Sequence, residues 1–134
     1  MSKPFRTTIE SGIAEVILDH PPVNAFDSAG WFAIADEIDA LGANDTVRVI
    51  IVAAEGKGFC AGVDIKELAA DRNRITAVNQ GNYDTFEAIH RNPRPVVVAL
   101  LHQNGLRGRH TAPLDEEAQA RETARGFLRA YGSA

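Results

Sequence analysis

Apolar residues recur along the first hundred positions in two patterns, one typical of strands and the other of helices. Residues 7–10 and Ile13–Leu18 alternate or run apolar on either side of Ser11-Gly12, which predicts a β-hairpin. Residues 47–53 and 96–101 form short apolar runs rich in β-branched side chains. Such runs favour strands that are buried on both faces of a sheet.

Helical spacing appears in two longer segments. Asp27 or Ser28 can cap a helix that extends to about residue 41. Its apolar stripe consists of Trp31, Ile34, Ala35, Ile38 and Leu41. A second helix is predicted over residues 74–90, whose apolar residues are Ile75, Val78, Tyr83, Phe86 and Ile89. The resulting order is strand, strand, helix, strand, short helix, helix, strand, which indicates an α/β protein.

The segment 47–68 links a predicted buried strand to the start of a short helix. Gly56, Gly58 and Gly62 permit a tight bend, and Asp64 can cap the helix that Ile65 begins. Backbone amides at such a turn are unpaired within the helix and can bind an anion or an oxygen that becomes negative during a reaction. The alternative interpretation is a structural connection without a ligand.

Three segments of this chain resemble one known family. GFCAGVDIKEL (residues 58–68) resembles the signature turn of the crotonase, or enoyl-CoA hydratase/isomerase, superfamily. PPVNAF (residues 21–26) resembles its first CoA-binding loop, and RPVVVAL (residues 94–100) resembles the strand before its second oxyanion-hole loop. The three segments occur in the family's order, and the resemblance covers about residues 5–100.

The resemblance implies a crotonase-like ββα spiral truncated to roughly its first half, with two parts in the chain. Residues 1–100 form the crotonase-like part, and residues 101–134 form a divergent loop and a helical tail. Residues 114–131 contain strong helix formers, acidic first and basic later, and predict a solvated or partner-docking helix. A deletion or frameshift that replaced the second half is one hypothesis for the origin of this tail.

The resemblance also implies a set of site residues. The amide of Val63 takes the place of the first oxyanion-hole donor, and Gly108 that of the second. The carbonyl of Ala61 would accept from the adenine amino group, and Lys66 would reach the CoA phosphates. The CoA-binding residues implied by the resemblance are Val23, Ala25, Ala61, Asp64, Ile65 and Lys66. Each of them is open to a plain structural interpretation as a turn or surface residue.

Acid–base groups are sparse in this pattern. The carboxylates near the turn are Glu55, Glu67, Asp71 and Glu87, and His90 and His102 are the candidate bases. Glu67 is the one we would test, although a surface charge is its ordinary role. No metal-ligand spacing is present, and no cofactor is expected besides the CoA thioester itself, as substrate or ligand.

Composition narrows the kinds of partner and the cellular locations that we expect. The net charge of −4 gives no electrostatic reason to expect a nucleic acid as partner. No apolar run reaches the length of a signal peptide or a membrane span, so we expect no membrane partner and a cytoplasmic location. The single cysteine, Cys60, excludes an internal disulfide. A small half-buried filler is the interpretation we favour for it over a nucleophile.

Two functions therefore stay open. One is an acyl-CoA-binding enzyme of the hydratase/isomerase type, a lyase by resemblance, that stabilises a thioester enolate. The other is a noncatalytic remnant or CoA-binding module without turnover. In either case we expect a homo-oligomer or a partner chain to cover the apolar surface that half a spiral exposes.

Overall fold

The computed structural model of this 134-residue chain describes residues 3–56 and 58–99. The elements in chain order are β1 (Phe5–Glu10), β2 (Ile13–Leu18), β3 (Ala25–Phe26), α1 (Ser28–Gly42), β4 (Val49–Ala54), β5 (Gly62–Val63), α2 (Ile65–Ala70), the 3₁₀ turn η1 (Arg72–Arg74), α3 (Ile75–His90) and β6 (Val96–Val98). The predicted order of strands and helices is confirmed, with three short elements added, β3, β5 and η1. The two-residue strands β3 and β5 were not expected from the pattern.

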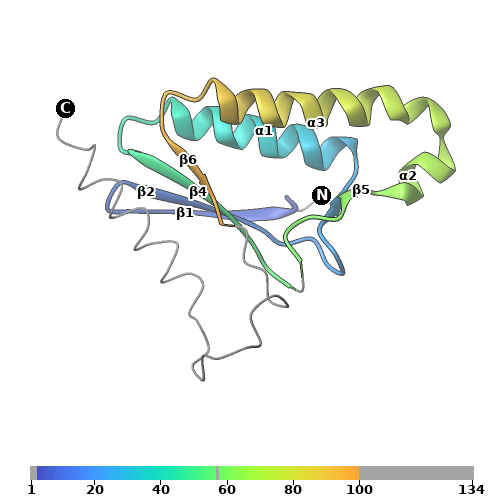
Figure 1. Cartoon of the computed structure of the whole chain (residues 1–134), viewed down its shortest axis with the longest axis horizontal. Helices are drawn as coiled ribbons and strands as arrows, with labels where there is room; N and C mark the ends of the chain where they lie inside the picture. Colours follow the sequence, from blue (N-terminus) through green and yellow to red (C-terminus); the bar gives the residue numbers. More distant parts are fainter. Residues whose placement is uncertain (1–2, 57, 100–134) are drawn as a thin grey trace, which may run out of the picture.

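Four strands form a sheet in the order β1-β2-β4-β6 (Figure 1). The hairpin pair β1–β2 is antiparallel, whereas β2–β4 and β4–β6 are parallel. A parallel pair needs a crossover connection, and the crossovers here contain α1 and α3. Both helices lie side by side over one face of the sheet (Figure 1).

The start and the buried stripe of α1 agree with the sequence pattern. Asp27 is the N-cap, because its Oδ1 accepts a hydrogen bond of 2.7 Å from the amide of Gly30. Ser28, the other candidate cap, is the first residue of the helix. The stripe predicted to face the core is buried and comprises Trp31, Ile34, Ala35, Ile38 and Leu41.

The contact between α3 and α1 depends on small side chains. A Cβ added at Gly81 would lie 2.9 Å from the Cβ of Trp31, so the two helices approach too closely for a larger residue. The buried residues of α3 are Val78, Gly81, Thr85 and Ala88. Tyr83 and Phe86, which belong to the apolar pattern of this helix, are each 62% exposed. Apolar spacing alone therefore does not identify the packed face of α3.

The core lies mainly between the sheet and the two long helices. Phe26, Ile38, Ile50 and Val16 are among its fully buried side chains. A smaller cluster of Ile13, Val49 and Ile51 lies apart from it, with Val97 and Ala99 packed against it. None of the helices within the described ranges is both long enough and apolar enough to cross a membrane.

Candidate functional site: the turn between β4 and α2

The short strands β3 and β5 bring two loops together that lie far apart in the sequence. Ala25 pairs with Gly62 and Phe26 pairs with Val63, in parallel orientation. The amide of Ala61 also donates to the carbonyl of Val23 at 3.1 Å. This pairing gathers the residues that the resemblance assigned to CoA binding and catalysis, namely Val23, Ala25, Ala61, Val63, Asp64, Ile65 and Lys66.

The amide of Val63 is directed away from the strand pair. The next amide, that of Asp64, donates to the carbonyl of Phe26 at 2.9 Å. Since consecutive amides of an extended strand point in opposite directions, the N–H of Val63 points away from β3. Among the described residues no carbonyl accepts from it. The preceding residue, Gly62, has a φ of +95°, a conformation that favours glycine and makes this bend possible.

The side chain of Asn24 joins the two loops through hydrogen bonds. Sequence reasoning missed this role. The Asn24 side chain is almost fully buried, and its Nδ2 donates to the carbonyls of Glu55 at 2.8 Å, Phe59 at 3.2 Å and Gly58 at 3.3 Å. Its Oδ1 accepts from the amide of His20 at 2.7 Å. The backbone of Asn24 has a φ of +53°, which asparagine tolerates better than most residues. That tolerance is the only sequence signal that marks this position.

Several of the gathered side chains face solvent. Val23 is 50% exposed and Ile65 is 76% exposed, and Ala61 and Lys66 are also exposed. The carboxylate of Asp64 accepts from the amide of Lys66 at 2.9 Å and caps α2, as the sequence predicted. The gathered residues therefore present backbone groups and apolar side chains at the surface. Their one carboxylate, that of Asp64, already accepts a hydrogen bond within the helix start.

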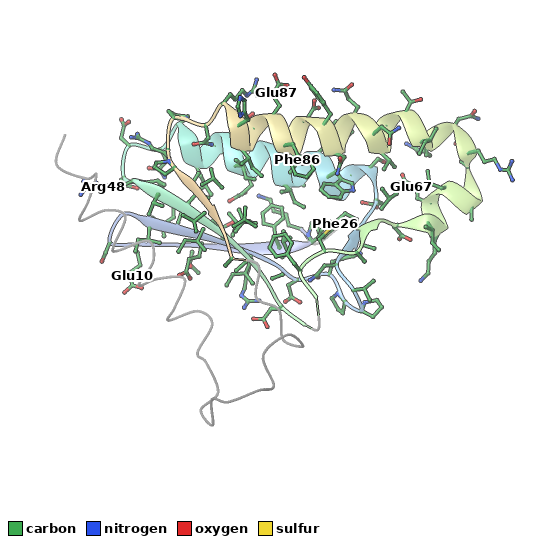
Figure 2. All side chains as sticks on the ribbon, in the orientation of Figure 1. Glu10, Phe26, Arg48, Glu67, Phe86 and Glu87 are labelled. Atoms are coloured by element: carbon green, nitrogen blue, oxygen red, sulfur yellow. The ribbon has the colours of Figure 1, made fainter. Side chains whose placement is uncertain are left out.

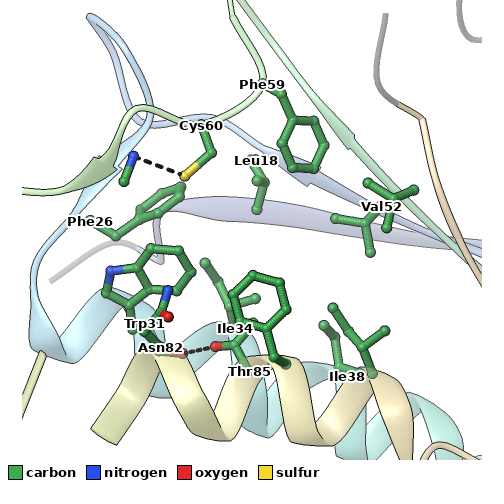
Figure 3. A pocket seen from close by; sticks show the side chains of 14 residues that line it. Leu18, Phe26, Trp31, Ile34, Ile38, Val52, Phe59, Cys60, Asn82 and Thr85 are labelled. Carbon is green, nitrogen blue, oxygen red and sulfur yellow. Dashed lines mark hydrogen bonds between the residues drawn. The ribbon is translucent and has the colours of Figure 1, made fainter. Parts of the chain in front are cut away.

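An apolar cavity of about 330 Å³ lies between the sheet, the two long helices and this turn (Figure 3). Its apolar lining includes Leu18, Phe26, Trp31, Ile34, Val52 and Phe59, and Cys60 and Gly62 close it at the turn. Two polar side chains line it as well, those of Asn82 and Thr85. The hydroxyl of Thr85 is engaged with the carbonyls of Trp31 and Gly81. The carboxamide of Asn82 has no hydrogen-bond partner among the described residues.

Trp31 and Cys60 serve as packing residues around this cavity. Trp31 belongs to the core and packs edge-on against Phe26, with ring centroids 5.5 Å apart. Cys60 is half-buried, and its Sγ accepts from the amide of Gly62 at 3.3 Å. Burial raises the pKa of the Cys60 thiol, while the hydrogen bond from Gly62 lowers the pKa by less. A raised pKa disfavours the thiolate, so the structure supports the filler interpretation over the nucleophile.

Two of the carboxylates near the turn, those of Glu55 and Glu67, are engaged in contacts with other residues. Glu55 pairs with Arg6 on the surface. Glu67 is half-buried and bonded to Ser28, at 2.8 Å from its amide and 2.7 Å from its hydroxyl. The expectation that Glu67 is merely a surface charge is therefore wrong. No carboxylate or imidazole occurs among the described residues that line the cavity.

Some predicted residues lie outside the part of the chain that the structure describes. Gly108, the candidate second oxyanion donor, and His102 are among them, as is the predicted helix over residues 114–131. Within the described ranges no group of three or more His, Cys, Asp and Glu side chains is placed to hold a metal ion.

Solved structures share this arrangement. An enoyl-CoA hydratase from Mycobacterium smegmatis superposes with a TM-score of 0.67 at 30% sequence identity, covering 74% of this chain and 40% of that chain. A putative enoyl-CoA hydratase from Streptomyces coelicolor superposes with a TM-score of 0.64, also at 30% identity. Strands, crossover helices and the turn after β4 thus define part of a crotonase fold.

The comparison of sequences identifies the family, which is more specific than the fold. The pattern that describes the enoyl-CoA hydratase/isomerase family matches residues 8–105, so this chain belongs to that family. One relative is the (7aS)-7a-methyl-1,5-dioxo-2,3,5,6,7,7a-hexahydro-1H-indene-carboxyl-CoA hydrolase of Mycobacterium tuberculosis, 44% identical over 96 residues that make up 70% of this chain and 39% of the relative. The hydrolase of the same name from Rhodococcus jostii is 45% identical over 96 residues, which are 37% of its length. The chain thus spans about two fifths of the length of these relatives.

Proposed function

We propose that this chain binds an acyl-CoA thioester and that the amide of Val63 donates to the thioester oxygen, stabilising it as it becomes an enolate. The observation that carries the proposal is the outward-directed N–H of Val63, next to a glycine that lines an apolar cavity. A backbone donor preorganised at such a position acts where negative charge develops. Gly108 stays the candidate for the second donor.

The exposed rim of the turn supports the placement of CoA there. Backbone groups of Val23, Ala25 and Ala61 lie together through the β3–β5 pairing. In this proposal the Ala61 carbonyl accepts from the adenine amino group, the Ile65 side chain covers the ligand together with Asp64, and Lys66 reaches the phosphates. The exposure of Val23, Ile65 and Lys66 leaves them free to make these contacts.

The acyl group of this proposal is bulky and contains a ring. The names of two relatives specify a carboxyl-CoA whose acyl part is a methylated indene carrying two oxo groups. A cavity of about 330 Å³ with an apolar lining lies at the small end of the range usual for ligand pockets, about 300–1,000 Å³. The carboxamide of Asn82 is the group in the lining that is available to a ring oxygen.

The test compares ligands and then removes the amide. Calorimetry of the full chain with CoA, acetyl-CoA and a cyclohexanecarboxyl-CoA should show binding of all three, with the cyclic thioester bound most tightly. Val63→Pro, which removes the N–H, should weaken thioester binding towards that of free CoA, whereas Val63→Ala, which keeps it, should not. Failure of all three ligands to bind the wild-type chain would refute the proposal. Urea denaturation of both variants shows whether the fold persists, and the wild-type preference for thioesters over CoA tests the idea without any variant.

Turnover is a separate question, because a second candidate function is a CoA-binding module without catalysis. It is favoured by the absence of acid–base side chains among the described residues lining the cavity. Each general acid or base contributes about 10²–10⁴ to a rate, and each oxyanion donor about 10²–10³. A crotonyl-CoA hydration assay beside the calorimetry distinguishes the two functions. Binding without turnover supports the CoA-binding module, and turnover that Val63→Pro abolishes supports the enzyme.

The oligomeric state and the cellular location of this chain stay predictions. A homo-oligomer or a partner chain would cover exposed apolar side chains such as Tyr83 and Phe86. Sedimentation of the purified chain tests this, since a stable monomer would argue against it. Fractionation of the source cells tests the expected cytoplasmic location.

A further inference from the structure

One carboxylate of the helix α2 bonds to the start of α1. Glu67 lies beside the N-terminal end of α1 (Figure 2), where its two oxygens accept from the amide and the hydroxyl of Ser28 at 2.8 and 2.7 Å. The two residues are separated by most of α1, by β4 and by the turn. This contact is therefore tertiary and connects the start of one helix to the first turn of another.

The N-terminus of α1 is a favourable place for that charge. The first amides of a helix have no partner inside the helix, and the helix dipole is positive there. Asp27 satisfies the amide of Gly30 from within the chain segment, and Glu67 satisfies the amide of Ser28 from outside it. Ser28 is 7% exposed, so without Glu67 a buried donor would lack a partner.

Other attachments of α2 are few. No residue of α2 is fully buried, and Ile65 at its start is 76% exposed. Leu68 packs against the main core as a partly buried residue. The side chain of Asp64 caps the helix from inside, and its amide bonds to the carbonyl of Phe26 just before α2 begins. Within the helix itself, Glu67 thus supplies the side-chain hydrogen bonds to the body of the protein.

We propose that Glu67 is a positioning residue for the CoA-binding segment from Asp64 to Lys66, acting through Ser28. This inference rests on the proposed function, because it concerns the same site. The β3–β5 pairing sets the direction of the Val63 amide. The segment ends one residue before Glu67, so the bond of that carboxylate to Ser28 sets the direction in which α2 leaves the strand pair, and with it that of the Lys66 side chain. Glu67 itself touches no ligand in this scheme.

The experiment uses the full chain with Glu67→Ala, Glu67→Gln and Ser28→Ala, and Glu87→Ala on α3 as the matched control. Glutamine keeps an oxygen for the Ser28 amide and a polar group for its hydroxyl. We expect Glu67→Ala to weaken acetyl-CoA binding roughly tenfold, Glu67→Gln to restore most of the affinity, and Glu87→Ala to leave it unchanged. Ser28→Ala, which keeps the amide, should lie between.

Hydrogen exchange separates positioning from general stability. Glu67→Ala should accelerate amide exchange in residues 61–70 while exchange in β4 stays as in the wild-type chain. Acetyl-CoA affinity within twofold of wild type, or faster exchange spread evenly over the molecule, would overturn the inference. If the wild-type chain binds no acetyl-CoA, the proposed function fails, and the local exchange of residues 61–70 still decides whether Glu67 positions this segment.

Discussion

Replacing Asn24 by aspartate should disrupt the site more than any surface change of the same kind. The Nδ2 of Asn24 lies within 3.3 Å of three backbone carbonyls, those of Glu55, Gly58 and Phe59. Asn24→Asp keeps the shape of the side chain but puts a carboxylate oxygen in place of the donor. Three acceptors would then face an acceptor with a negative charge, in a position that is 3% exposed.

The size of the effect follows from these contacts. An amide group has two hydrogens, so two good hydrogen bonds are lost, each contributing about 0.5–1.5 kcal/mol net. Burial of an uncompensated charge adds to this, and we expect a total loss of about 3–5 kcal/mol in the free energy of unfolding. Because burial raises the pKa of the introduced carboxyl in the folded chain, the charge penalty should be full only above that raised pKa. It should shrink as the pH falls towards about 3.9, the ordinary pKa of aspartate.

Urea denaturation followed by tryptophan fluorescence measures this loss, since Trp31 lies in the same core. The matched control is Asn73→Asp in η1, whose residues are exposed, and it should change the stability by less than about 0.5 kcal/mol. Should the aspartate variant not fold, Asn24→Gly accepts the φ of +53° without steric cost and should lose about 2–3 kcal/mol. A loss below about 1 kcal/mol in both Asn24 variants would refute the reasoning.

Two further predictions concern the packing around the cavity. Gly81→Ala should lower the free energy of unfolding by about 1 kcal/mol in urea, because a Cβ 2.9 Å from that of Trp31 costs more than the helix propensity it adds. Asn79→Ala on the exposed side of the same helix is the control, and a stabilised Gly81→Ala would contradict the close contact of α1 and α3. Cys60 should react with iodoacetamide several-fold more slowly in the native chain at pH 8 than in urea, because burial raises the pKa of its thiol. Equal rates in the two states would show that the thiol is not shielded.

Local signals in the sequence predict most of this fold. The signals are short-range: each cap, Asp27 and Asp64, begins the helix next to it, and β2 and β4 are apolar runs in themselves. Each element appears close to its predicted bounds. The helix expected over residues 74–90 begins at Ile75 and ends at His90. These features depend on spacing, capping and β-branched content, all of which a single sequence displays.

The features that assemble the site are not local. A two-residue strand such as β3 has no period to recognise, and its pairing with β5 depends on how the loops meet in space. The bonds from Asn24 and Glu67 join residues more than thirty positions apart. The residues that line the cavity come from β2, β3, β4, β6, α1, α3 and the turn, so only the packed structure reveals them.

The register of the sheet also sets the order in which this chain can fold. The hairpin of β1 and β2 forms from neighbouring residues, but Ile13 must pair with Val49, and Ile50 must pair with Val96. Such pairings close long loops before they gain stability, which slows folding. During synthesis on a ribosome, β4 has one parallel neighbour until β6 emerges. Its apolar edge is then open to other chains, and this interval is when aggregation would compete with folding.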